Sequence, residues 1–126
     1  MNSEILKDVE ELVGITEDSE PAFRKELILH INAALNVLSQ IGIGDGKEFY
    51  IKDGTETWKD FIGEATPNNL HMIKQCVAAR VRLAWDTPLS SSVVEVLKEQ
   101  IKEYEWRLNA AVDNPYTGGN LLNVEG

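Results

Sequence analysis

Apolar residues recur at intervals of three and four along two neighbouring stretches of the chain, 67–85 and 92–112. The first stretch carries two such rows, composed of Leu70, Ile73, Val77, Val81 and Ala84 and of Met72, Cys76, Ala79 and Leu83. The second carries one continuous stripe, composed of Val94, Leu97, Ile101, Tyr104, Leu108 and Ala111. This spacing predicts two α-helices, and two apolar rows indicate a helix covered on more than one side. We therefore expect helix 67–85 to lie at the centre of the fold.

Residues at the ends of these two helices match known start and stop signals. Thr66 and Pro67 suit the first turn of the central helix. Pro88 prevents that helix from continuing through the polar elbow that follows it. Ser92 with Glu95 three residues later is typical of a capping box. These signals predict a helix, an elbow and a second helix in succession.

Two further helices are predicted in the N-terminal third of the chain. Helix 3–13 begins at Ser3 as its cap and stops at Gly14, while the second begins at Pro21 and ends in the glycine-rich run 42–46. Their buried faces are expected to contain Ile5, Leu6, Val9, Leu12 and Val13 in the first and Phe23, Leu27, Ile31, Ala34, Leu35, Leu38 and Ile41 in the second.

The segment between these helices and the central one has mixed signals. Residues 48–51 could form a short strand, and Asp53-Gly54 could form the turn of a hairpin. Thr57 followed by Asp60, however, is typical of a helix cap. We favour an irregular arm that ends in one or two helical turns.

Together the pattern predicts an all-α fold, a small bundle of about four main helices with a short extra helix near Trp58. The helical domain is expected to span 1–112, and residues 113–126, where the periodicity stops, are expected to form an extended C-terminal tail.

Composition changes this picture mainly through charge. Of the 126 residues, 43% are hydrophobic and 26% are charged, and the net charge is −9. The first two values are ordinary for a globular protein. An acidic chain is a poor match for nucleic-acid phosphates, so DNA should be repelled and not gripped. A single cysteine excludes an intrachain disulfide. We also expect no signal peptide and no membrane span, and synthesis in the cytoplasm.

No group of residues predicts catalysis or the binding of a metal or cofactor. His71 and Cys76 are five positions apart on one helix. They therefore lie about 140° apart around its axis and cannot share a metal ion. Cys76 lies in an apolar row, where a thiol is buried and inert. The run 42–46 follows a helix, whereas phosphate-binding loops follow a strand. We therefore predict no enzyme activity and no cofactor.

Three residues are candidates for contacts between subunits. Trp106 comes two residues after Tyr104 and so lies off the apolar stripe of the last helix. Arg80 and Arg82 interrupt the central helix on different sides. A buried guanidinium needs a carboxylate, which a neighbouring chain could supply; the alternative is that these side chains extend to solvent. Trp58 and Trp85 are interpreted as core or ring-contact aromatics.

Several of these stretches resemble the head–tail connector, or adaptor, family of long-tailed bacteriophages. The resemblance rests on residues 81–88, 90–91 and 101–109 and on the earlier stretch 57–63, and it extends over roughly residues 10–112. It implies a structural protein that forms a ring of about twelve subunits beneath the portal, extends the DNA exit channel and offers a platform for the next neck protein. It also implies a place in the virion neck, with DNA passing through without specific binding.

The tail lies outside this resemblance but carries well-spaced apolar residues. We expect it to dock on the portal or on a neighbouring subunit, with Tyr116, Leu121, Leu122 and Val124 as anchors.

Two other functions compete with the connector. The first is a small acidic regulatory or inhibitor protein that binds a basic partner surface, which the charge supports equally well. The second is an enzyme that uses Glu95, Glu99 and Glu103. These carboxylates alternate with lysines on a solvated helix face, where they lack the desolvation that acid–base catalysis by carboxylates requires.

Overall fold

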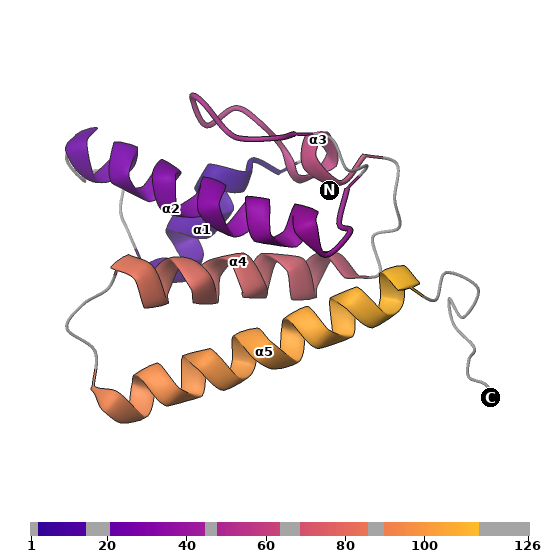
Figure 1. Ribbon diagram of the computed structural model, residues 1–126. Coiled ribbons are helices and arrows are strands. Elements are labelled where there is room, and N and C mark those ends of the chain that lie inside the picture. Colours follow the sequence, from indigo (N-terminus) through magenta and orange to yellow (C-terminus); the bar gives the residue numbers. More distant parts are fainter. Residues whose placement is uncertain (1–2, 15–20, 45–47, 64–68, 86–89, 114–126) are drawn as a thin grey trace.

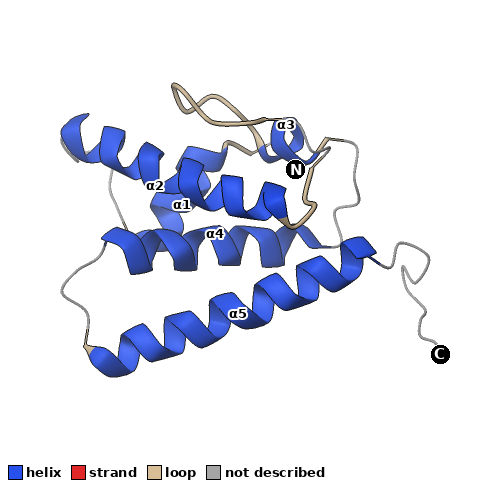
Figure 2. Cartoon of the chain, in the orientation of Figure 1, coloured by secondary structure: helices blue, strands red, loops and turns tan. Residues whose placement is uncertain are grey.

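The computed structural model describes residues 3–14, 21–44, 48–63, 69–85 and 90–113, which form five α-helices (Figures 1 and 2). The helices are α1 (Ile5–Val13), α2 (Pro21–Gln40), α3 (Trp58–Ile62), α4 (Leu70–Trp85) and α5 (Ser91–Asp113). The only β-type pairing among these residues is an isolated bridge between Glu4 and Thr57. The all-α prediction is therefore confirmed. None of the described helices is both long and apolar enough to cross a membrane.

Helix α4 is the central element, as the two apolar rows predict. It packs against α1, α2 and α5, and Figure 1 shows α2 and α5 on either side of it, both running antiparallel to it. Its buried side chains are Ile73, Val77 and Val81 of the first row, Cys76 and Ala79 of the second, and Ala78, which belongs to neither. The expected cap at Thr66 and Pro67 lies outside the described residues.

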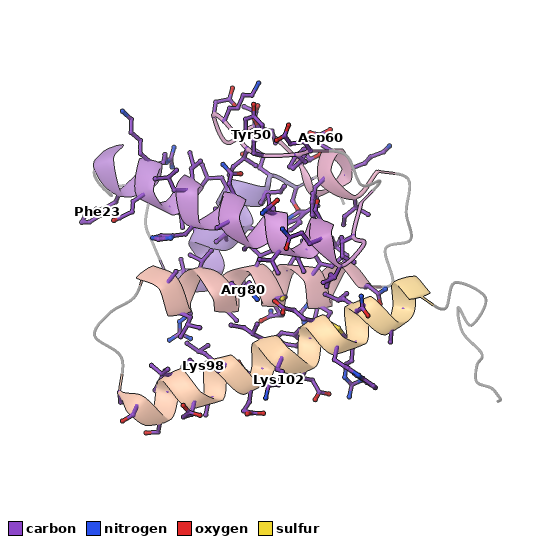
Figure 3. The ribbon with its side chains drawn as sticks, in the orientation of Figure 1. Phe23, Tyr50, Asp60, Arg80, Lys98 and Lys102 are labelled. Atoms are coloured by element: carbon purple, nitrogen blue, oxygen red, sulfur yellow. The ribbon has the colours of Figure 1, made fainter. Side chains whose placement is uncertain are left out.

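The expected core faces of α1 and α2 are confirmed except near one end of each helix. The buried side chains are Ile5, Leu6 and Val9 of α1 and Leu27, Ile31, Ala34, Leu35 and Leu38 of α2. Phe23 and Leu12 were expected in the core but are 50% and 41% exposed. Phe23 lies at the N-terminal end of α2 and points away from α4 (Figure 3), and Leu12 lies in the last turn of α1. At these ends the neighbouring helices do not cover the apolar face.

The arm at 48–57 is irregular, and the hairpin alternative is not adopted. The side-chain amide of Asn32 on α2 donates to the carbonyl of Ile51 at 3.0 Å and accepts from its N–H at 2.7 Å. The carboxylate of Glu56 accepts from the N–H groups of Lys52 and Gly54. These side chains satisfy backbone groups that a strand would otherwise pair. Helix α3 follows the arm and begins at the predicted cap, Thr57, which forms a capping box with Asp60.

Two of the predicted caps are wrong. The residue that caps α1 is Glu4, without a side-chain cap bond, and the N–H of Ile5 donates to the carbonyl of Glu56 at 3.0 Å. The Ser3 hydroxyl instead donates to Asp8. At α5, the hydroxyl of Ser90, and not that of Ser92, accepts from the N–H of Val93 at 3.2 Å. The predicted stop at Gly14 is confirmed, since its backbone is left-handed, as is common just after a helix.

Candidate interaction surfaces

Two cavities among the described residues are small. One of about 150 Å³ lies between α2, the arm and α3, and another of about 90 Å³ lies between α1, α4 and α5. Both are smaller than the pockets that usually hold small-molecule ligands. Among the described residues, no three His, Cys, Asp or Glu side chains are placed to hold a metal ion together.

Cys76 lies in the core of the interface between α4 and α5. Burial raises the pKa of its thiol to about 12, and the charge of Glu105 acts in the same direction. Its Sγ lies 4.0 Å from Oε2 of Glu105. A thiol with so high a pKa is protonated at neutral pH and is therefore a weak nucleophile.

Arg80 finds its carboxylate partner within the chain. Its Nε donates to Oε2 of Glu105 on α5, and Figure 3 shows Arg80 between the two helices. Both side chains are partly buried, and the hydrogen bond to Glu105 raises the pKa of Arg80. The carboxylate expected from a neighbouring chain is thus already supplied by α5. A contact between subunits at Arg80 stays a prediction.

Arg82 lies two residues further along α4 and faces a different side. It lines the cavity of about 90 Å³, together with Leu12 from α1 and Leu97 and Tyr104 from α5. Its assignment to a contact between subunits also stays a prediction.

Besides the pair of Arg80 and Glu105, a polar cluster around Asp8 connects three helices. Its Oδ2 accepts from the Ser3 hydroxyl at 2.7 Å and from the Trp58 indole at 2.8 Å, and it forms an ion pair with Lys74 at 3.1 Å. Burial alone would raise the pKa of Asp8, but these hydrogen bonds and the charge of Lys74 lower it below its ordinary value. Trp58 itself is fully buried, as its interpretation as a core aromatic predicts. The cluster holds α1, α3 and α4 together.

The outer surface of α5 carries the most exposed large hydrophobic side chain described. Trp106 is 71% exposed. The helical repeat places it on the side of α5 opposite the buried stripe. Glu95, Glu99 and Glu103 are exposed on the same side. Glu103 pairs with Arg107 at 2.6 Å, four residues along the helix. The three carboxylates lack the burial that would tune them for acid–base catalysis.

The outer surface of α2 holds a second such residue, Leu29, which is 68% exposed. The sequence pattern did not predict Leu29 as a functional residue, because Leu29 lies outside the apolar positions spaced by three and four along this helix. A signal was nevertheless present, since residues 27–44 contain no Asp, Glu, Lys or Arg although the chain is 26% charged. An uncharged surface with an exposed leucine is typical of the centre of a protein interface.

The four proposed anchors of the tail, Tyr116, Leu121, Leu122 and Val124, lie outside the described residues. Their docking stays a prediction.

Comparison with known proteins shows the family to which the chain belongs. A family model described as Phage connector protein matches residues 5–115, from the first residue of α1 to just past the end of α5. Neither a curated protein nor a solved structure matches the chain. The family match includes all five helices, which confirms the resemblance seen in the sequence. The chain therefore belongs to the phage connector protein family, and it is a structural connector of the phage virion.

Proposed function

We propose that the chain assembles into a ring of about twelve subunits beneath the portal of a DNA-filled head, where it extends the exit channel and receives the next neck protein. The observation that carries this proposal is the connector-family match over the whole helical domain, residues 5–115. The surfaces of the protomer support it. Large hydrophobic side chains are exposed on α2 and on α5, and aromatic side chains such as Trp106 commonly anchor protein interfaces.

The distribution of charge supports passage of DNA without binding. Helix α4 carries the basic residues Lys74, Arg80 and Arg82 and no acidic residue. Two of these cations form ion pairs inside the protomer, Lys74 with Asp8 and Arg80 with Glu105. Because the chain as a whole carries −9, a ring would present an acidic surface along which duplex DNA slides without sticking. A measured channel surface that is basic or neutral would contradict this part.

The tail is proposed to dock on the portal or on a neighbouring subunit through Tyr116, Leu121, Leu122 and Val124. The tail begins at the last residue of α5, Asp113, and all of it after residue 115 lies outside the family match. Its apolar residues stand on a Gly- and Asn-rich segment too short to form a core of its own. Removal of residues 113–126 should leave the far-ultraviolet circular dichroism and unfolding temperature of the domain unchanged and abolish its binding to the portal. Unchanged affinity for the portal would contradict the docking.

The function is tested by measuring mass in solution, for the protein alone and mixed with the portal protein of the same phage. The proposal predicts a closed ring near twelve times the mass of one chain, bound to the portal. A one-to-one or two-to-two complex with some basic partner, without a ring on the portal, would overturn it. That result would favour the acidic inhibitor instead.

A further inference from the structure

Each of the two outer helices presents a continuous exposed ridge on the side turned away from α4. Residues spaced by three and four form each ridge, and every one of them is exposed. The α2 ridge consists of Lys25, Leu29, Ala33, Asn36 and Gln40. The α5 ridge consists of Glu95, Glu99, Glu103, Trp106 and Ala110.

The two ridges differ in a way that makes them complementary. The α2 ridge carries one lysine and no carboxylate, whereas the α5 ridge carries three glutamates. Two of these, Glu99 and Glu103, also form ion pairs with Lys102 and Arg107 on the same helix. Each ridge has one large exposed hydrophobic residue, Leu29 on α2 and Trp106 on α5. Opposite charge and paired apolar residues favour contact between the ridges.

The position of the ridges suits a ring. A ring is built from head-to-tail contacts, in which one surface of a subunit meets a different surface of the next. Helices α2 and α5 lie on either side of α4 (Figure 1). The residues of each ridge are exposed, on the side of their helix opposite its buried residues. The ridges therefore lie on two different sides of the protomer, as a head-to-tail contact requires.

The direction of the helices sets how the ridges align. Both α2 and α5 run antiparallel to α4, so they run parallel to each other (Figure 1). The small rotation between neighbours in a large ring preserves this direction, and α2 of one subunit would meet α5 of the next in parallel. If Leu29 is set against Trp106, the parallel register brings Lys25 beside Glu103 and Ala33 against Ala110. Opposite charges, apolar side chains and small residues then all fall in pairs.

We propose that the α2 ridge of one subunit packs in parallel against the α5 ridge of the next, with Leu29 against Trp106 at the centre of the contact. This inference rests on the proposed ring, for which it supplies the interface between subunits. The partner that each ridge contacts is another copy of this chain.

Two substitutions test the contact, each of which introduces a negative charge at the centre of one ridge. Ring formation is measured for the full chain mixed with the portal protein. Leu29→Glu and Trp106→Glu are exposed substitutions, and unchanged circular dichroism establishes that each variant folds. Each variant alone should lose the ring. Val96→Glu is the matched control, because Val96 is also an exposed hydrophobic residue of α5 but precedes Trp106 by nearly three helical turns. It should keep the ring.

Mixing the two defective variants makes the test specific. The intact α5 ridge of Leu29→Glu can meet the intact α2 ridge of Trp106→Glu only once, so the mixture should contain two-chain species and no ring. Leu29→Cys mixed with Trp106→Cys should likewise give a disulfide-linked dimer under mild oxidation, whereas each cysteine variant alone should give none. Cys76 is buried and stays out of this exchange.

The outcomes separate this contact from the proposed function. If the wild-type protein forms rings and either glutamate variant still does, the contact is wrong and the ring stands. Absence of the cross-linked dimer from the mixed cysteine variants also contradicts the contact. If the wild-type protein forms no ring with portal, the proposed function fails first.

Discussion

The indole Nε1 of Trp58 donates a hydrogen bond to Oδ2 of Asp8 at 2.8 Å, between residues fifty positions apart. The N–H of Trp58 donates to the carbonyl of Ser3, and the N–H of Ile5 donates to the carbonyl of Glu56. The short helix α3 is thus fixed to the start of α1 by both side-chain and backbone bonds. A helix of five residues has little stability of its own, so these contacts hold it in place.

Replacement of Asp8 by Asn should destabilise the fold, because the amide keeps the size of the side chain but loses its charge and part of its accepting capacity. We expect the free energy of unfolding to fall by about 1–3 kcal/mol. Urea unfolding followed by tryptophan fluorescence measures the change. The control is Glu11→Gln, an exposed substitution on the same helix, which should change this free energy little because it breaks no buried contact. Equal effects of the two substitutions would contradict the role of Asp8.

Because of the lowered pKa of Asp8, we expect the free energy of unfolding to depend on pH. Burial acts to raise its pKa, but the bonds from Ser3, Trp58 and Lys74 outweigh burial and hold the pKa of the folded state below the ordinary 3.8. The ionised carboxylate therefore stabilises the fold above that ordinary value, and the contribution is lost as the pH falls through the lowered pKa. The difference in unfolding free energy between wild type and Asp8→Asn should shrink below about pH 4. A difference that stays constant down to pH 2 would argue against the lowered pKa.

The pair of Arg80 and Glu105 should couple α4 to α5. Both side chains are partly buried. Arg80→Met or Glu105→Gln leaves the other group without its charge partner, and each should cost about 1–3 kcal/mol. The double substitution should cost less than the sum of the two, by at least about 0.5 kcal/mol, because the residues are in contact. Chemical unfolding of the four proteins gives this coupling energy. Strict additivity would show that the ion pair contributes nothing.

Cys76 should be unreactive in the folded protein. Its pKa of about 12 and its full burial predict that a disulfide reagent at pH 8 modifies it only as fast as the protein unfolds. Above pH 9 the unfolded thiol ionises while the folded thiol does not, so wild-type stability should fall toward pH 12. The fall should be smaller in Cys76→Ala, whose other titrating groups are the same. Rapid labelling of the native protein would contradict this account.

Gly54, the single glycine of the arm, should not be replaceable by alanine without loss of stability. Its φ is +96°, and an added Cβ would lie 2.6 Å from Cδ2 of Leu6, which is itself buried. Gly54→Ala should therefore cost both backbone strain and a clash, about 2–4 kcal/mol in total. Gly14→Ala is the control, since Gly14 also has a positive φ but open space around the added methyl group. It should cost only about 1 kcal/mol. Thermal unfolding of both variants compares the two costs.

Features that depend only on residues close to one another along the chain could be predicted from the sequence. The apolar rows of α4 and the stripe of α5 follow the helical repeat, and the stop at Gly14 and the cap at Thr57 are local signals. Ser3 and Ser92 also resemble caps locally, but tertiary contacts intervene at α1 and the helix start falls two residues earlier at α5. Local signals cannot decide between such competing donors and acceptors.

Partners that are distant along the chain were not predictable. Asn32 with Ile51 and Arg80 with Glu105 are brought together only by the packing of whole helices. The exposure of Trp106 could be anticipated from its place off the stripe. Leu29 could have been found from the uncharged run around it. Only the fold shows that the helices of the two residues, α2 and α5, lie on different sides of α4 (Figure 1).

The central claim is that the helices of this protein serve as surfaces for assembly on a portal. Electron cryomicroscopy of the protein bound to the portal of the same phage tests it most directly. The account predicts a closed ring of subunits coaxial with the portal, with α2 of each subunit beside α5 of the next. Portal particles that carry single, separate copies of the protein, or none, would contradict it.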